Sequence, residues 1–539
     1  VRVPAAAVET MAAMIGRVLS AFRATRPPAR CFLAAVAALS IAGCAVGPDF
    51  HRPAAPDAGS LGAGSLPTTT GVTNIAGGQA QHFVSGGDIP ADWWTLFHSP
   101  ALNALIEQSL AHNPDLKAAQ AALAVAREST QAGRSAYYPS VTAGLSASRE
   151  QDPPGALAPV PSNNAYLYNL FTPQLSISYV PDVFGLNRRT VESAKAQEQA
   201  VRFQMIATQV TLSANVVVAA IQQASLQSQV DATRQLVDIN AKMLKILRYQ
   251  LAKGYAGRLD VSAQESQLAQ VAATLPPLLK QLAQQDNLLA VLAGQFPGQS
   301  KTPKFDLASL QLPQDLPLSL PSQLVVQRPD VRQAQANMHA ASAQVGVATA
   351  NRLPNITLTA NVGSNALAIG QVFKAGTGFW SLGADIAAPI FQGGTLLHQQ
   401  RAAKAAYVQA AAQYRSTVLT AFQNVADTLA ALEQDAEGLK AAAHAADAAK
   451  VTLDLSQRQL KDGYASYLTV LSAEQAYQQA RIGLVQAQAD RYADTAALFQ
   501  ALGGGWWHRA DLQQADSKQA GSKQAHPIEA GPIQDADEK

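Results

Sequence analysis

Four short segments of the chain alternate between apolar and polar side chains. In the first two segments, the apolar positions are Val141, Ala143, Leu145 and Ala147, and then Leu175, Ile177 and Tyr179. The third and fourth segments repeat the pattern at Ile356, Leu358, Ala360 and Val362, and at Leu382, Ala384 and Ile386. A period of two predicts β-strands with one apolar and one polar face. Half-buried strands of a soluble sheet share this pattern, but a length of about ten residues is typical of membrane-spanning strands.

Two long segments, 185–251 and 394–460, contain no proline and carry apolar residues at seven-residue spacing. The first stripe consists of Val216, Val230, Val237, Leu244 and Leu251. The second consists of Val418, Val425, Leu432, Leu439, Leu453 and Leu460. Such stripes predict helices packed side by side as in a coiled coil. At 1.5 Å per residue, each helix would be roughly 100 Å long.

Shorter helices are predicted around the strands and after the long helices, at 101–137, 259–294, 322–352 and 468–503. In each half of the chain the order is short helix, two strands, long helix, tight turn and short helix. The summed lengths of the two short helices in each half are close to that of the long helix. We therefore expect two short helices to stack end to end beside each long one.

This order recurs because part of the chain is duplicated. The segment 254–261 (GYAGRLDV) returns 209 residues later as 463–470 (GYASYLTV), and Glu265 and Glu474 keep the same offset. Pro114 and Pro139 return as Pro329 and Pro354, both 215 residues later. Shared offsets at several markers indicate that a whole supersecondary unit occurs twice.

The N-terminal region has the pattern of a secretory signal. Arg17, Arg23, Arg26 and Arg30 precede an apolar run at 31–43 that ends in Ile41-Ala42-Gly43-Cys44. This run is shorter than the ~20 helical residues needed to span a bilayer, and its charged flank and small residues are typical of a signal peptide. With a cysteine at the cleavage site it resembles a bacterial lipoprotein signal, which predicts a lipid on Cys44. An ordinary signal cleaved nearby is the alternative.

The composition narrows the function classes. Hydrophobic residues make up 48% of the chain, with alanine prominent among them, and charged residues make up only 14%. A net charge of +2 gives no reason to expect a nucleic-acid partner. The sequence has no Ser/His/Asp order, no Cys/His metal spacing and no phosphate-binding glycine loop. We therefore expect no enzyme and no cofactor other than the lipid on Cys44.

Four strands cannot close a barrel, and unpaired strand edges in hydrocarbon cost about several kcal/mol per backbone group. The smallest bacterial barrels have about eight strands, so the chain must oligomerise as a dimer, trimer or tetramer. The threonine, serine and asparagine faces would then line the lumen, and the leucine, isoleucine and valine faces would meet lipid. Long helices continuing such a wall predict a passive conduit.

Several motifs identify a resemblance. They are Gly43-Cys44-Ala45-Val46-Gly47-Pro48-Asp49-Phe50, Trp93-Trp94-Thr95-Leu96-Phe97, Asn113-Pro114-Asp115-Leu116, Arg328-Pro329-Asp330-Val331 and Pro389-Ile390-Phe391-Gln392-Gly393-Gly394. In this order the chain resembles the TolC-like outer-membrane factors, specifically the NodT/OprM-type lipoproteins of tripartite efflux systems. The resemblance covers Cys44 to about Trp507.

The resemblance implies a mainly α-helical protein with a membrane β-sheet. It implies a homotrimer in which four strands per chain close a twelve-stranded barrel, continued by a helical tunnel in the periplasm. The partners it implies are a periplasmic adaptor, an inner-membrane pump of the RND type and outer-membrane lipid. The protein would be a lipid-anchored channel of the bacterial outer membrane that releases drugs or other small molecules.

The resemblance also implies site residues at the two glycine turns. Gly254, Tyr255, Gly463 and Tyr464 match the turns that adaptors contact. The aperture at the tunnel end would involve Leu468 as a hydrophobic constriction, with Ser472, Thr469, Tyr467, Arg258 and Asp260 as further candidates. Thr469 and Ser472 stand where the family often has aspartate, so at these two positions the chain departs from the family's acidic ring, and the sequence leaves open whether the aperture carries one. Helix termination alone would explain the glycines, and packing would explain the tyrosines.

We expect the following organisation: signal peptide 1–43, lipid-anchored segment and equatorial region 44–100, repeat 101–294, inter-repeat equatorial linker 295–321, second repeat 322–507 and disordered tail 508–539. Two other functions remain open. One is an exit duct for polypeptides in type I secretion, and the other is a lipid-anchored periplasmic coiled-coil scaffold whose strands form a soluble cap.

Overall fold

The computed structural model describes residues 45–54, 69–151, 153, 166–299, 302–318 and 321–509. Cys44, the expected signal peptide and the tail beyond 509 lie outside these residues. The chain divides into two compact units. The first, which we call the sheet unit, contains Glu128–Lys195, His339–Val408 and the described residues up to Phe50. The second, the hairpin unit, contains Ala196–Met338 and the described parts of His51–Arg127 and Gln409–Lys539.

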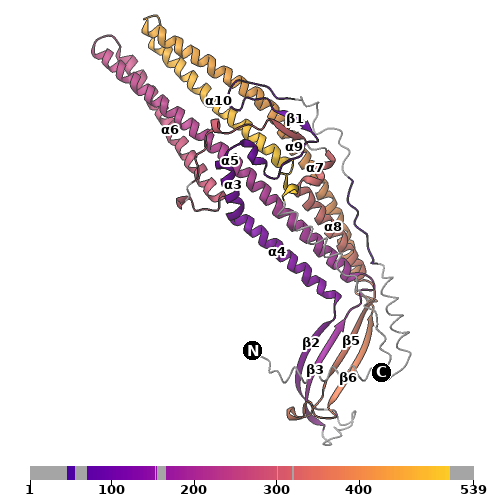
Figure 1. Ribbon diagram of the computed structural model, residues 1–539. Coiled ribbons are helices and arrows are strands. Elements are labelled where there is room, and N and C mark those ends of the chain that lie inside the picture. Colours follow the sequence, from indigo (N-terminus) through magenta and orange to yellow (C-terminus); the bar gives the residue numbers. More distant parts are fainter. Residues whose placement is uncertain are drawn as a thin grey trace, which may run out of the picture. The chain divides into compact units, whose positions relative to one another are not determined.

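The sheet unit contains the four predicted strands as one antiparallel sheet (Figure 1). The strands are β2 (Ser140–Gln151), β3 (Leu167–Tyr179), β5 (Asn355–Ser364) and β6 (Gly378–Ala387), in the order β2-β3-β5-β6. The predicted strand pattern is confirmed. The two hairpins β2-β3 and β5-β6 pair with each other through β3 and β5.

The register of the sheet places like residues opposite one another. Val141 pairs with Ile177 on the next strand, and Ala360 pairs with Leu382. On the other face, Ser176 pairs with both Thr142 and Asn361. Because side chains alternate along a strand, this register joins apolar positions of all four strands on one face and polar positions on the other. The sequence alone predicted an apolar and a polar face for each strand, and the register aligns the like faces of neighbouring strands.

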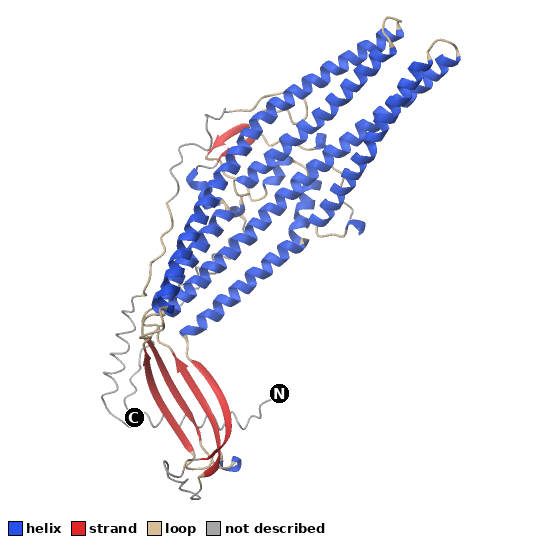
Figure 2. Cartoon of the chain, turned by 180° about the vertical axis from the view of Figure 1, so that it is seen from behind, coloured by secondary structure: helices blue, strands red, loops and turns tan. Residues whose placement is uncertain are grey.

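The hairpin unit consists of long helices joined in pairs (Figure 2). Helix α5 (Leu186–Ala252), which belongs to this unit from Ala196 on, turns into α6 (Arg258–Leu292). Helix α9 (Thr395–Lys461), which belongs to it from Gln409 on, turns into α10 (Tyr467–Ala501). Both long helices have 67 residues, as predicted, which corresponds to about 100 Å each. The two helical hairpins lie side by side, with their turns at the same end (Figure 1).

The predicted helices 101–137 and 322–352 are each divided in two, so the prediction of uninterrupted helices was wrong. The first consists of α3 (Pro100–His112) and α4 (Pro114–Arg134), and the second of α7 (Pro321–Gln327) and α8 (Pro329–Ala350). Each break falls on the residue before a proline, because a proline disfavours helical backbone at the residue that precedes it. At the first break, Asn113 has ψ 127° and its Oδ1 accepts from the amides of the next helix.

The core of the hairpin unit is aromatic. Trp93 is fully buried and stacks on Phe499 at 5.2 Å between ring centroids, while the Tyr492 hydroxyl donates to the Leu310 carbonyl at 2.8 Å. Trp506 and Trp507 pack against the same core. Beside the core, β1 (His82–Ser85) and β4 (Asp315–Leu318) form a parallel pair that was not predicted. Strands of four residues are too short for a period to show.

The apolar stripes of the long helices face inward. Val216, Val230, Val425, Leu432 and Leu439 are all fully buried. Among the described helices, α5 alone is long and apolar enough to cross a membrane, and 67% of its apolar window is buried inside the protein. A buried core helix passes the same test, and the packing of α5 accounts for its apolar window.

Candidate functional site

The two hairpin turns have the same backbone conformation. Gly254 has φ +77° and Gly463 has φ +78°. In each turn the glycine amide donates to the carbonyl three residues earlier, at 3.0 and 3.2 Å. The amide of the following tyrosine donates to the carbonyl five residues earlier, at 2.9 and 2.8 Å. This is the Schellman motif, which requires a left-handed residue and explains the glycines.

Each turn then starts its returning helix with a cap. In the first turn the Gly257 amide donates to Oδ2 of Asp260 at 3.0 Å, and in the second Oγ of Ser466 accepts from the Thr469 amide at 3.3 Å. Between glycine and cap, Tyr255 and Tyr464 are 84% and 86% exposed. Each turn therefore presents one aromatic side chain to solvent, and exposed aromatics are enriched at protein interfaces.

The first residues of the two returning helices differ. Arg258 is exposed, whereas Tyr467, at the equivalent position of the second turn, is only 8% exposed. The Tyr467 hydroxyl donates to Oε1 of Gln264 on α6, which joins one helical hairpin to the other. Burial raises the pKa of the Tyr467 hydroxyl, and the charges of Glu474 and Asp260 raise it further. A phenol that stays protonated remains a hydrogen-bond donor.

The other predicted aperture residues lie on the surface of the chain. Leu468 is 50% exposed, and Thr469 and Ser472 are exposed beside it on α10. The Ser472 hydroxyl donates to the Leu468 carbonyl at 3.1 Å. The structure brings these three residues together on one helix, while Arg258 and Asp260 lie on the other hairpin. Their role in an aperture stays a prediction.

A buried polar network connects the hairpins below the turns. We call Asn240, Gln264, Tyr467 and Glu474 the hairpin network; all four are at least nine-tenths buried. Gln264 Nε2 donates to the Asn240 side-chain and backbone oxygens, both at 2.9 Å, and Asn240 Nδ2 donates to Oε1 of Glu474 at 3.2 Å. Burial raises the pKa of the Glu474 carboxyl. The network therefore favours the neutral form of the Glu474 carboxyl.

Sequence reasoning missed Asn240 and Gln264 and used Glu474 only as a repeat marker. A signal was available for Asn240, which lies between Val237 and Leu244 in the heptad stripe. A polar residue at a buried heptad position is a known way to specify partner and register. No local signal identifies Gln264, because its partners come from α5 and α10.

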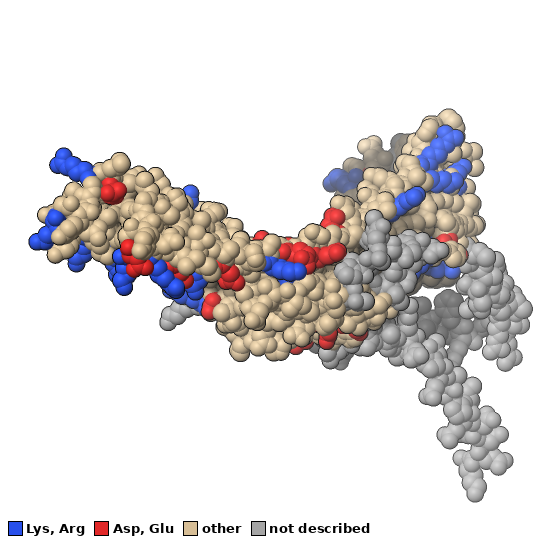
Figure 3. Space-filling view, turned by 90° about the horizontal axis from the view of Figure 1, so that it is seen from above, with Lys and Arg blue, Asp and Glu red and all other residues tan. Residues whose placement is uncertain are grey.

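A second acidic group lies on α9 and α10. Burial raises the pKa of Asp435 to about 7, and hydrogen bonding and repulsion from Asp494, with repulsion from Asp490, act in the same direction. The nearby Arg491 opposes this rise. Arg491 itself is fully buried and donates to the Thr70 hydroxyl at 2.9 Å. On the face shown in Figure 3, acidic side chains gather in a patch near the middle, and lysine and arginine side chains lie at several other places.

Among the described residues there is no group of three or more His, Cys, Asp or Glu side chains that could hold a metal ion. His339 and His398 lie on α8 and α9. His339 contacts Glu192, with 2.8 Å between Nε2 and Oε1.

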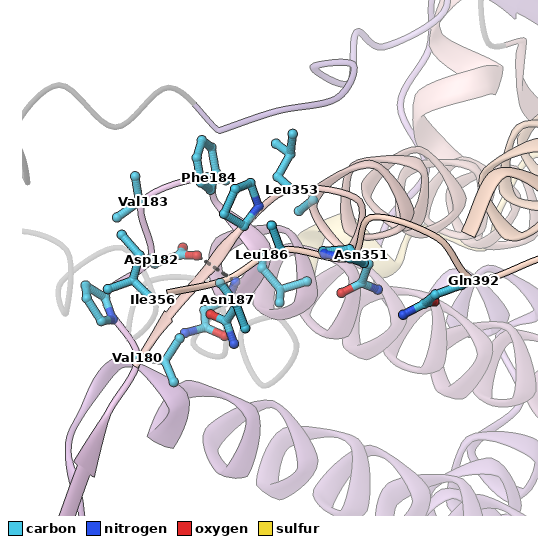
Figure 4. A pocket seen from close by; sticks show the side chains of 17 residues that line it. Val180, Asp182, Val183, Phe184, Leu186, Asn187, Asn351, Leu353, Ile356 and Gln392 are labelled. Atoms are coloured by element: carbon cyan, nitrogen blue, oxygen red, sulfur yellow. Dashed lines mark hydrogen bonds between the residues drawn. The ribbon is translucent and has the colours of Figure 1, made fainter. Parts of the chain in front are cut away.

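The sheet unit contains a pocket of about 380 Å³ where the strands meet the helices (Figure 4). Three segments line it: 180–187, 350–356 and 387–392. Asp182 organises one wall, because its Oδ1 accepts from the Asn187 amide at 2.9 Å and its Oδ2 from the Arg188 amide at 2.8 Å. These bonds satisfy free amides at the start of α5.

The sequence and the fold of this chain match those of known proteins. The family model described as "Outer membrane efflux protein" matches residues 105–295 and 320–504. A probable efflux pump outer membrane protein, TtgC of Pseudomonas putida, is 30% identical over 480 residues, covering 88% of this chain and 95% of TtgC. The pyoverdine export outer membrane protein OpmQ of Pseudomonas aeruginosa is 29% identical over 454 residues, covering 83% of this chain and 94% of OpmQ.

Solved structures of outer-membrane channels share the fold. The outer-membrane channel OprN is 27% identical, with a TM-score of 0.76, and the match covers 86% of this chain and all of OprN. The outer membrane protein VceC of Vibrio cholerae is also 27% identical, with a TM-score of 0.71 over 78% of this chain and all of VceC.

Proposed function

The chain belongs to the outer membrane efflux protein family and is the outer-membrane component of a tripartite efflux pump, and we propose that it serves there as a passive exit duct for small organic molecules. Relatives are described as exporting toluene, antibiotics and pyoverdine. We therefore assign small molecules rather than polypeptides as the cargo. A conduit takes what its pump supplies, so the pump sets the exact substrate.

The four-stranded sheet carries this proposal. Its apolar face is continuous across all four strands, and β2 and β6 have no further strand partner among the described residues. Such edges are tolerated in lipid only when other strands pair with them. Three chains that pair β6 of one with β2 of the next close a barrel whose polar face lines the lumen.

The partners follow from family and geometry. The protein works as a homotrimer with a periplasmic adaptor and an inner-membrane pump, which we assign to the RND type. We propose that the adaptor contacts the turns at Gly254 and Gly463, where Tyr255 and Tyr464 are exposed. A trimer presents two such turns per chain.

The chain acts as a duct and not through catalysis in this proposal. It needs no cofactor, and its one covalent addition is a lipid on Cys44, which anchors it in the outer membrane. We propose Leu468 as the hydrophobic constriction of the periplasmic aperture, flanked by Ser472, Thr469 and Tyr467 from the second repeat. Arg258 and Asp260 contribute the charges of the first repeat.

A matched pair of substitutions tests the channel. Leu382 and Ser381 are neighbours on β6 that point to the apolar and the polar face of the sheet. Leu382→Lys places a charge in lipid, at a cost of about 2–4 kcal/mol near the bilayer midplane, and should remove the trimer from the outer membrane. Ser381→Lys should leave the trimer in place and lower cation conductance in planar bilayers.

Three outcomes would contradict parts of this proposal. If both lysine variants assemble equally well, the apolar face does not meet lipid. If the purified protein conducts no ions, the scaffold interpretation is favoured. If cells that carry the matching pump and adaptor export a polypeptide but no small molecule through this duct, the chain serves type I secretion.

A further inference from the structure

The segment that directly follows Cys44 is fixed to the sheet unit. We call Ala45–Phe50 the strap. The Val46 amide donates to the Phe184 carbonyl at 3.1 Å. At Gly185, which has φ +82°, a Cβ atom would come within 2.6 Å of the Ala45 Cβ. Ala45 therefore lies directly on the backbone of the 184–185 turn, and glycine at 185 makes room for it.

Arg189, in the first turn of α5, is the main contact of the strap. Its side chain is 5% exposed. Nε donates to the Val46 carbonyl at 3.1 Å, and Nη2 donates to the Gly47 carbonyl at 3.4 Å and to Oδ1 of Asp49 at 2.7 Å. The remaining nitrogen, Nη1, donates to Glu192 at 2.8 Å. A buried guanidinium needs such partners, and most of them come from the strap.

The second half of the strap, from Gly47 to Phe50, is also in close contact with the sheet unit. Gly47, at φ +97°, lies so close to Gly346 of α8 that a Cβ on it would meet the Gly346 Cα at 2.4 Å. The Phe50 ring stacks on His339 with 4.3 Å between centroids and 13° between planes. Glu192 connects the two ends, because it accepts from Arg189 and contacts His339. The strap therefore has one defined position and direction.

The start of the strap adjoins one wall of the pocket at Phe184, and no residue of the strap itself lines the pocket. Phe184, whose carbonyl accepts from Val46, lines the pocket together with Leu186, Leu353 and Ile356 (Figure 4). Residue 44 is one step along the chain from Ala45, about 3.8 Å between Cα atoms. A volume of about 380 Å³ lies within the usual range of small-molecule pockets, about 300–1,000 Å³.

We infer that the strap and Arg189 form a clamp for the lipid anchor, and that the pocket holds the glyceryl group and the first methylenes of the lipid on Cys44. This inference rests on the proposed lipidation. It assigns the pocket one occupant, a modified part of this chain. The apolar side chains take the methylenes, and the neighbouring asparagine side chains take the ester oxygens.

A photoreactive fatty acid tests the occupant. Cells are grown with a palmitate that carries a photoreactive diazirine near its carboxyl end. They would incorporate this palmitate into the lipid on Cys44. After irradiation of the purified trimer, mass spectrometry should find crosslinks in the peptides that contain Phe184, Leu353 or Ile356. Ala388→Phe, at an exposed alanine of the pocket lining, should reduce these crosslinks severalfold. Ala375→Phe, outside the pocket, is the matched control and should leave them unchanged.

Hydrogen exchange on the same trimer tests the clamp. The Val46 amide should be protected in the wild type, and Arg189→Gln should raise exchange across 46–50. Asp49→Asn provides a milder second variant in case Arg189→Gln does not assemble. Arg127→Gln removes the ion pair between Arg127 and Glu198, neither of which belongs to the strap, and should not change strap exchange.

The outcomes separate the clamp from the lipidation. Absence of label from the protein would mean that Cys44 carries no lipid, and the premise would fail. Label on Cys44 with crosslinks only to phospholipid or to the strands would overturn the pocket as its binding site. Unchanged strap exchange in both Arg189→Gln and Asp49→Asn would overturn the clamp.

Discussion

The turns of the two helical hairpins have nearly identical backbones and different surroundings. Gly254 and Gly463 share one left-handed conformation, and the exposure of Tyr255 and Tyr464 is nearly equal. A few residues further on, the copies diverge. Glu265 is exposed and pairs with Arg248 at 2.7 Å, whereas its counterpart Glu474 is 3% exposed and faces Asn240.

The difference shows which parts of a repeat are set locally. Helix ends depend on hydrogen bonds within a few residues, so duplication preserved them. Burial depends on the neighbouring element, and α10 turns Glu474 and Tyr467 toward α5 and α6 of the other hairpin. The second turn is therefore bonded to the first through the hairpin network, while Arg258 and Glu265 stay exposed.

The largest expected effect comes from breaking this network. Gln264→Leu leaves the Tyr467 hydroxyl and Oδ1 of Asn240 without a hydrogen-bond partner from position 264, at a cost of about 1–3 kcal/mol per orphaned group. We expect faster hydrogen exchange across 463–475 and a lower melting temperature of the trimer. Gln270→Leu, on the exposed face of the same helix, is the control. Equal effects of both variants would mean that the network does not hold the hairpins together.

Valine at the turn glycines tests whether the two backbones are equivalent. A left-handed residue with a side chain costs roughly 1–2 kcal/mol, and neither glycine has a neighbour that a Cβ would meet. Gly254→Val and Gly463→Val should therefore lower the melting temperature by similar amounts. A large difference between the two would show that the turns are not interchangeable.

The buried carboxyl of Glu474 predicts a pH dependence of the second hairpin. The pKa of folded Glu474 is raised above its unfolded value of about 4.3. Its stabilising contribution is therefore complete below that value and is lost as pH rises through the folded pKa. The neighbouring Tyr467, whose pKa is raised, stays protonated over this range.

Hydrogen exchange of 463–475, corrected for intrinsic rates, should therefore become faster between acidic and neutral pH. Glu474→Gln should remove this dependence, because glutamine stays neutral. Glu265→Gln should keep it. A wild-type profile without pH dependence would mean that Glu474 does not titrate within the network.

The smallest expected effect concerns the exposed face of the second turn. Ser472→Asp adds a carboxylate to each of three chains and should narrow the closed aperture or increase its cation selectivity in planar bilayers. Ala263→Asp places the same charge at the equivalent position of the first turn. Unchanged conductance and selectivity in Ser472→Asp would remove this residue from the aperture.

Much of the fold could be predicted because its signals are periodic. The alternation at 141–147 and 356–362 predicted strands, and the stripe through Val216 predicted α5. The breaks at Asn113 and Arg328 were predictable from the following prolines but were missed. The parallel pair β1 and β4 was not predictable, because four residues carry no readable period.

The candidate sites also contain features that the sequence predicted and features that it did not. The sequence by itself determined the turns at Gly254 and Gly463, since left-handed backbone needs glycine there, and it determined which face of each strand is apolar. Only the tertiary structure decided that Glu474 is buried while Glu265 is exposed, and that Arg189 holds the residues after Cys44. Hydrogen bonds and burial between segments that lie far apart in the sequence depend on which helices pack together, and no local pattern encodes that choice.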